Sequence, residues 1–175
     1  KLDDMRPFNY TNSFDFDLRT TAVFRDPTAW THVVMRVDTT QSSSGDRVRL
    51  YVNGTQITAF DTESQPSQNF DTAFGINSTV MYVGDATGSS SYNGYLAETI
   101  FTDGQSYAPT QFGETKNGVW IPINPSGTTF GNNGFHLKYG NASNLGVDSS
   151  GNGNNFTSSG LGTDHQVLDS PTFGS

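Results

Sequence analysis

The acidic residues are the side chains that could support hydrolytic catalysis. A glycosidase needs two carboxyl groups, and in retaining enzymes these lie about 5 Å apart. Glu98 is the only acid within the predicted strand 95–101, and Asp103 would have the opposite side-chain parity if that strand continued. Glu63 and Glu114 lie in predicted loops. No glycosidase pair is predicted, so we expect Glu98 to be structural and the protein not to be an enzyme.

The three histidines predict no catalytic or zinc constellation. His32 lies on the strand face opposite Val33, His136 alternates with Leu137, and His165 falls in the terminal loop. A nucleophile–histidine–acid triad or a zinc site needs side chains that converge, and this spacing does not bring the histidines together. We therefore expect all three to be structural.

A calcium site is the metal chemistry that the sequence favours most. Residues 148–154 read DSSGNGN, so Asp148, Ser150 and Asn152 offer oxygen ligands at alternating positions around flexible glycines. The segment lacks the bidentate glutamate that completes an EF-hand loop. Turns rich in Asn and Asp also satisfy their own backbone, so both readings stay open. No cofactor is required, and calcium is the candidate.

The elements that would position these residues are short strands. Residues 33–37 and 48–52 alternate, which predicts an apolar face made by Val33, Met35 and Val37 on one strand and the matching residues of the next. Asn53-Gly54 predicts a type I′ hairpin turn into a third strand over 55–60. Further strands are expected at 14–18, 80–83, 95–101 and 135–139, with loops at 42–46 and 62–78 and one helical turn at 109–113.

Composition agrees with a single all-β domain. The chain has 175 residues, no cysteine and 13% aromatic residues, which supply the burial that a Gly-, Ser- and Asn-rich disordered chain would lack. The net charge is −8 without a basic cluster, which argues against nucleic acid binding. No apolar run approaches the roughly twenty residues that span a bilayer, so we expect no membrane insertion. We predict a sandwich over residues 1–125 and a Gly/Asn/Ser-rich extension over 126–175, which either completes the sandwich or contacts a neighbouring subunit.

The order of several motifs resembles a known family. The pattern W-x-H-V-V…D…R-L-Y-V-N-G between Trp30 and Gly54, followed by MYVGD at 81–85 and YNGYLAETIF at 92–101, resembles laminin G-like, concanavalin A-like jelly-roll domains. FRDPTAW at 24–30, DGQ at 103–105, FGE at 112–114, NGFHLKY at 133–139 and the 148–154 run are similar to a lectin-like segment of tail-fibre and other surface proteins of tailed bacteriophages, marine ones especially. The resemblance implies an antiparallel jelly-roll sandwich.

Carbohydrate binding is the function that this resemblance implies. Asn, Asp and Gly in loops suit hydroxyl recognition, and aromatic faces suit sugar stacking. The candidate ligand residues are Asp85, Tyr92, Asn93 and Tyr107, whereas Trp30 and Trp120 are expected in the core. By analogy with calcium-binding laminin G-like domains, Asp85 and Asp38 are further metal candidates.

The predicted role is therefore adhesion to host-surface glycans by a virion surface protein, most simply a fibre or fibre-like appendage. The resemblance also implies other virion proteins as partners, a homotrimer, and a location on the surface of an extracellular particle. One alternative is a purely structural virion module, such as a head decoration or fibre stalk. Another is a bacterial polysaccharide-binding module. Exposed aromatic and Asn/Asp clusters at one loop end would favour adhesion, and exposed apolar patches would favour a structural part.

Overall fold

The structure, a computed structural model, describes residues 8–10, 14–26, 28–74, 80–84, 92–168 and 171. These residues divide into two compact units. Unit 1 comprises Lys1–Ala73, Ser106–Gly127 and Pro171–Ser175, and unit 2 comprises Phe74–Gln105 and Thr128–Ser170. The predicted division into residues 1–125 and 126–175 stays a prediction.

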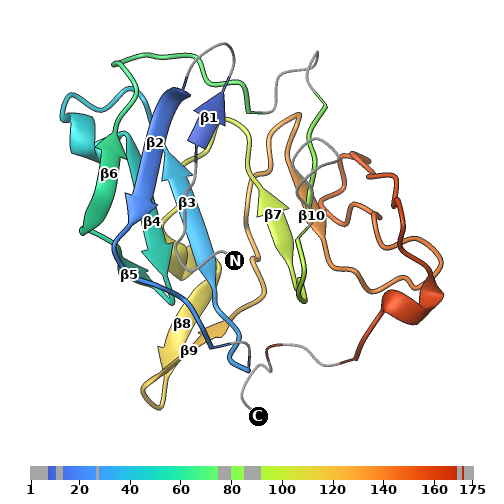
Figure 1. The fold of residues 1–175 in the computed structure, drawn as a ribbon. Coiled ribbons are helices and arrows are strands. Elements are labelled where there is room, and N and C mark those ends of the chain that lie inside the picture. Colours follow the sequence, from blue (N-terminus) through green and yellow to red (C-terminus); the bar gives the residue numbers. More distant parts are fainter. Residues whose placement is uncertain are drawn as a thin grey trace. The chain divides into compact units, whose positions relative to one another are not determined.

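The first sheet of unit 1 has the order β1-β2-β6 and is antiparallel, formed by Phe8–Tyr10, Phe14–Thr20 and Phe60–Ser64 (Figure 1). The strand predicted at 14–18 is confirmed. Its alternation places Phe16 and Leu18 on the inner face, and both side chains are fully buried.

The second sheet of unit 1 has the order β3-β4-β5, formed by Val33–Val37, Val48–Val52 and Thr55–Gln56. Asn53 and Gly54 have φ values of 47° and 76°, which confirms the type I′ turn between β4 and β5. The loop predicted at 42–46 is also confirmed, and it carries the 3-10 turn η1, Ser44–Asp46. Val48 and Leu50 are buried on the central strand of this sheet.

The prediction that β3 buries its apolar face is wrong for two of its residues. Val33 lies opposite Val52 and Met35 lies opposite Leu50, so they share a face with the buried β4 side chains. Their side chains are nevertheless 46% and 37% exposed. The reason is that β3 is the edge strand of its sheet, where fewer neighbours cover a side chain than on central β4.

Two other boundaries in unit 1 differ from the prediction. The sequence predicts a third meander strand over 55–60, but β5 ends at Gln56 and the chain crosses to the other sheet, where β6 begins at Phe60 and pairs with β2. The start of the predicted loop at 62–78 therefore belongs to β6. After β6, the Gln65 side chain accepts a hydrogen bond from the Val48 N–H at 3.1 Å and donates to the Val48 carbonyl at 3.2 Å. This pair of bonds joins the two layers of the sandwich.

The remaining segment of unit 1 contains the 3-10 turn η2, Pro109–Gln111, and the hairpin of β8, Gly113–Lys116, with β9, Val119–Pro122. The predicted turn with Pro109 in its first position is confirmed. Trp120 on β9 lies against Gly54 and Gly113, so closely that a Cβ added at either glycine would overlap its ring. Trp120 is therefore a packed residue, as predicted, whereas Trp30 is 36% exposed.

Unit 2 is held by the antiparallel pair β7, Thr99–Phe101, and β10, Phe135–Leu137, which lie side by side in Figure 1. A further bridge joins Leu137 to Asp148. Phe135 contacts Phe101 and Phe156, with ring centroids 5.7 and 4.7 Å apart, and buried Leu137 and Leu145 extend this core. The unit also contains the 3-10 turn η3, Thr163–His165.

Three predicted strands of unit 2 are shorter or absent. The strand predicted at 95–101 begins at Thr99 because Glu98 has a φ of 56°, a left-handed conformation that interrupts an extended backbone. The described residues 80–83 form no strand; Gly84, with a φ of 81°, instead accepts a hydrogen bond from the Tyr92 N–H. The strand predicted at 135–139 ends at Leu137, before Tyr139, whose φ is 53°.

The structure is all-β with antiparallel strands, as the sequence predicts, and its architecture is a β-sandwich. The helical elements among the described residues are the three 3-10 turns. None of the helices found in the described ranges has the length and hydropathy needed to cross a bilayer.

Candidate functional site

Three exposed tyrosines lie on two hydrogen-bonded segments of unit 2, and we take them as candidate ligand residues. Tyr82, Tyr92 and Tyr95 are 55%, 51% and 66% exposed, and we name them the tyrosine surface. A 2.7 Å hydrogen bond from the Tyr92 N–H to the Gly84 carbonyl joins their two segments, 80–84 and 92–98. Exposed tyrosine is amphipathic, because its ring offers an apolar face and its hydroxyl a polar handle.

Glycine allows the tyrosine at the centre of this surface to fold back on its own loop. A Cβ at Gly94 would meet the Tyr92 hydroxyl at 2.7 Å and its ring at 2.9 Å, so a larger residue would displace the ring. The Tyr92 hydroxyl also donates to the Tyr95 carbonyl at 3.4 Å. Exposed Leu96 lies in the same segment. This segment therefore exposes both aromatic and aliphatic side chains.

The predicted ligand residues have different locations. Tyr92 and Asn93 are exposed on these segments, and Asp85 lies outside the described residues. Tyr107 is half-buried in unit 1, with its ring edge-on to Phe112 at 6.2 Å. Sequence reasoning missed Tyr82 and Tyr95, because it assigned both to strands. The signal that could have found them is their position close to Gly84 and Gly94, where the strands break.

The residues predicted to bind calcium form a hydrogen-bonded cluster in unit 2. One Asp148 carboxylate oxygen accepts from the His136 and Ser150 amides, both at 2.8 Å, and the other accepts from the Ser150 hydroxyl at 2.8 Å and the Asn154 amide at 2.9 Å. Burial raises the pKa of Asp148, but these hydrogen bonds outweigh it and hold the pKa below its ordinary value.

Two asparagine side chains of the same loop donate hydrogen bonds to the neighbouring 131–134 turn. Asn152 Nδ2 donates to the carbonyls of Gly131 at 2.6 Å and Gly134 at 2.9 Å, and Asn154 Nδ2 donates to those of Asn132 at 3.0 Å and Gly134 at 2.9 Å. We name Asp148, Ser150, Asn152 and Asn154 the asparagine clasp. This arrangement supplies a structural role for the loop, and calcium binding by Asp148, Ser150 and Asn152 stays a prediction.

The other metal candidates can be placed in part. Asp38 accepts hydrogen bonds from the Thr40 hydroxyl at 2.6 Å and from the Gln41 amide at 2.7 Å, and these bonds hold the pKa of Asp38 below its ordinary value despite some desolvation. Within the described ranges, no group of three or more His, Cys, Asp and Glu side chains could hold a metal ion.

Glu98 has a histidine as its hydrogen-bond partner. Its carboxylate bonds Nε2 of His136, which is buried and stacked on Phe130 with ring centroids 6.0 Å apart. Nearby, the hydroxyls of Thr99 and Tyr139 are hydrogen-bonded. Burial raises the pKa of Tyr139, the Thr99 bond partly offsets this, and the Glu98 charge adds to it. The carboxylate of Glu98 is thus engaged by a histidine, and its structural role stays a prediction.

The other histidines occupy separate places. His32 in unit 1 lies 5.8 Å from the Trp120 ring between centroids, and burial lowers the pKa of His32. His165 accepts a bond from the Gly162 amide at 2.9 Å and contacts Asp164. Each histidine thus has its own surroundings, in which it can act as a structural residue.

Comparison with known proteins places this structure in a family. A laminin G-type family model described as the concanavalin A-like lectin/glucanases superfamily matches residues 6–105. The chain belongs to this superfamily, and the predicted concanavalin A-like sandwich is confirmed. No match was found among curated proteins or among solved structures. The matched range includes the tyrosine surface and ends before the asparagine clasp.

Proposed function

We propose that the chain is a lectin-like module of a bacteriophage virion surface protein, carried on a fibre or fibre-like appendage and adhering to host-surface glycans. Membership in a superfamily named for lectins and glucanases supports the sugar-binding part. The virion part rests on the motif order described above. It carries with it the expectation of other virion proteins as partners, a homotrimer, and a location on the particle surface.

The tyrosine surface is the observation that carries the sugar-binding proposal. Pyranose rings present faces of C–H groups that can lie on an aromatic ring, while Tyr hydroxyls and the nearby Asn93 side chain can bond sugar hydroxyls. Tyr92, Asn93 and Tyr95 are exposed on one segment, and exposed aromatic and Asn residues in a loop are the pattern that we expect for adhesion. The net charge of −8 further favours uncharged glycans over polyanionic ones.

We propose binding without cleavage. Glu98 is the acid of the 95–101 segment, and its carboxylate is engaged by buried His136. A retaining or inverting hydrolase needs a second carboxyl group across the scissile bond. The residues that follow Glu98 on β7 are Thr99, Ile100 and Phe101, none of which is an acid.

A glycan array tests the sugar-binding proposal. The wild-type chain, Tyr95→Ala, Tyr95→Phe and Trp30→Ala would be compared on immobilised neutral glycans. We expect Tyr95→Ala to weaken binding by about tenfold, or about 1.4 kcal/mol, through loss of the stacking face. Tyr95→Phe keeps the ring and should retain most of the binding, and Trp30→Ala controls for loss of an exposed aromatic elsewhere.

Two array results would contradict the proposal. One is the absence of binding to every glycan by the folded wild-type chain. The other is equal binding by Tyr95→Ala and the wild type. The virion part has a separate test, because imaging of the intact assembly would count the copies around the local symmetry axis. A three-fold appendage with residues 80–96 facing outward supports adhesion.

One observation favours the structural alternative. Val33 and Met35 expose apolar side chains on β3, which is an edge strand among the described strands, and exposed apolar groups at a sheet edge suit contact with another protein. Substituting both residues by Thr keeps β propensity and removes this apolar surface. Loss of self-association in sedimentation, with glycan binding unchanged, would assign β3 to assembly.

A further inference from the structure

We propose that a hollow in unit 2, lined by residues 142–145, 155–158 and 161, is a second binding subsite for a neutral, hydroxyl-rich ligand such as a sugar residue. The hollow has a volume of about 400 Å³. It lies outside residues 6–105, the range that the family model matches. The ligand class rests on the proposed function, but the site uses none of the residues of the tyrosine surface.

The size and lining of the hollow suit a small polar molecule. Ligand sites commonly have volumes of about 300–1,000 Å³ and combine apolar walls with a few polar groups. The apolar part of the wall is Leu145, Phe156 and Leu161. The polar part consists of hydroxyl and amide side chains from both segments: Ser143, Asn144, Asn155, Thr157 and Ser158. None of the lining residues is charged, so the site offers hydrogen bonds without an ionic partner.

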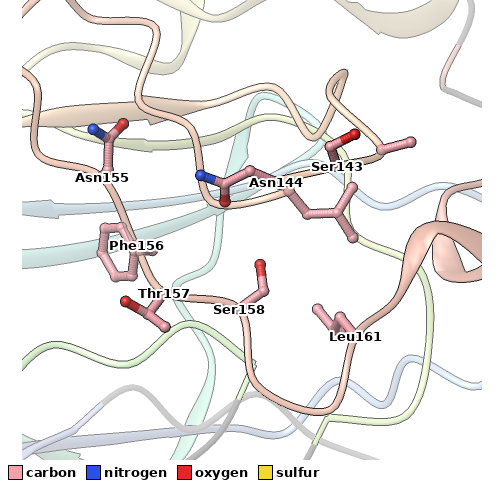
Figure 2. A pocket seen from close by; sticks show the side chains of 9 residues that line it. Ser143, Asn144, Asn155, Phe156, Thr157, Ser158 and Leu161 are labelled. Atoms are coloured by element: carbon pink, nitrogen blue, oxygen red, sulfur yellow. The ribbon is translucent and has the colours of Figure 1, made fainter.

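Two side chains of the segment 155–161 are directed across the hollow. Figure 2 shows the Ser158 hydroxyl and the Leu161 side chain directed towards the segment that carries Asn144. Asn144 Oδ1 accepts a bond from the Gly146 amide at 3.1 Å, which fixes the orientation of this side chain. The amide nitrogen at the other end is the group that Asn144 can offer to a ligand.

The two segments are held together without a ligand. The Phe156 amide donates to the Gly146 carbonyl at 2.8 Å. A Cβ added at position 146 would overlap the Phe156 carbonyl oxygen, so the segments can approach this closely only at a glycine. The Phe156 ring is fixed against Phe135 at 4.7 Å. A preformed wall lowers the ordering cost of binding.

The asparagine clasp connects directly to this wall. Asp148 N–H donates to Asn155 Oδ1 at 2.9 Å, and Asn155 precedes Phe156 on the rim of the hollow. The sequence predicts the DSSGNGN motif as a calcium candidate. In the structure its first residue holds Asn155, where the segment that lines the subsite begins. The motif acts in the proposal as a support and not as a ligand-binding group.

A neighbouring hollow extends the surface available to a ligand. It has a volume of about 210 Å³, shares Asn144 and Leu145 with the first, and is also lined by Lys138 and Tyr139. Asn144 therefore stands between two adjoining spaces. We expect an oligosaccharide of more than one ring to contact residues of both hollows.

NMR titration of the isotope-labelled chain tests the subsite. The neutral probes are glucose, galactose, N-acetylglucosamine and the disaccharides cellobiose, lactose and chitobiose, with sialyllactose as the charged comparison. We expect at least one neutral sugar to shift the backbone amides of residues 143–145 and 155–161. Ser158→Phe should fill the hollow and weaken this effect at least about tenfold. Ser159→Phe, an exposed neighbour that does not line the hollow, is the matched control.

The outcomes separate this inference from the proposed function. Shifts in the hollow that persist in Tyr95→Ala and vanish in folded Ser158→Phe support the subsite. Shifts confined to residues 80–84 and 92–96 overturn the subsite and leave the proposed function standing. Shifts confined to the hollow support the subsite and remove the tyrosine surface as the site of adhesion. Binding of sialyllactose alone, no shift with any sugar, or unchanged binding by Ser158→Phe overturns the subsite.

Discussion

At the scale of single residues, Trp120 shows how closely this small fold is packed. Its indole lies over two backbone positions, Gly54 in the β4–β5 turn and Gly113 at the start of β8. Any side chain at either position would overlap the ring. The sequence predicts Trp120 in a packed position from its flanking Val119 and Ile121, but it does not reveal the two glycines, because those contacts join segments far apart in the chain.

Replacing Gly113 tests this packing. A Cβ at position 113 would lie 2.6 Å from three atoms of the Trp120 ring, so the ring or the strand must shift. We expect Gly113→Ala to lower the free energy of unfolding by about 1–3 kcal/mol, the usual cost of overpacking. The control is Gly45→Ala, where nothing lies within 4 Å of the added Cβ. Equal urea midpoints for the two variants would contradict the account.

Asp148 gives a pH-dependent prediction. Its pKa is lowered in the folded protein, so the unfolded chain binds more protons at Asp148 between the folded pKa and the unfolded value of about 3.8. The stabilisation is present above that value and is lost as the pH falls through the folded pKa. We expect acid unfolding curves of the wild type to show this loss and those of Asp148→Asn to lack its contribution.

The control for this measurement is Asp71→Asn, which removes an exposed carboxylate from unit 1. Stability would be measured by chemical denaturation over a range of pH that begins near neutrality and ends below the unfolded pKa of Asp148. If the difference in stability between the wild type and Asp148→Asn did not change with pH, the hydrogen-bonded carboxylate would have no role in acid stability.

At the scale of elements, the asparagine clasp fixes a turn that has little regular structure. The 131–134 turn is held on one side by Asn152 and Asn154, and on the other by Asp103, which accepts from Asn133 Nδ2 at 2.8 Å. Buried or half-buried carbonyls that lose their donors are costly. The clasp therefore stabilises the approach to β10.

Removing both clasp amides tests that role. We expect Asn152→Ala combined with Asn154→Ala to lower stability by about 1–3 kcal/mol for each amide removed. Hydrogen exchange should accelerate first in residues 131–137. Asn141→Ala, whose side chain accepts a local bond from the Ser143 amide, is the comparison. Unchanged exchange in the double variant would show that the turn stands without the clasp.

The same scale shows which elements the sequence could predict. The alternation at 14–18 and the Asn53-Gly54 turn are local signals, and both predictions are confirmed. The limits of β7 depend on the left-handed Glu98, which makes its contact with a histidine 38 positions away. Likewise, the exposure of Val33 depends on the position of β3 at a sheet edge. The local hydrophobic periodicity of the sequence predicts neither the start of β7 nor the exposure of Val33.

At the scale of the whole molecule, the fold class follows from short alternating runs, frequent turns and spaced aromatics, and family membership confirms it. The sequence predicts the candidate site only in part. Tyr92 and Asn93 are predicted because they lie in a Gly-bounded loop. The segment of Tyr82 is joined to theirs by the backbone bond between Gly84 and Tyr92. Tyr95 is missed because the predicted strand 95–101 begins only at Thr99. A hydrogen bond between two irregular segments cannot be predicted from the periodicity of either segment.

We propose above that the chain holds glycans on the tyrosine surface. The most direct test is a crystal structure of the chain with the strongest neutral glycan from the array bound. We expect a sugar ring lying face to face with Tyr92 or Tyr95, with its hydroxyls bonded by residues of 80–84 and 92–96. A bound sugar that leaves all three tyrosines untouched would contradict the claim.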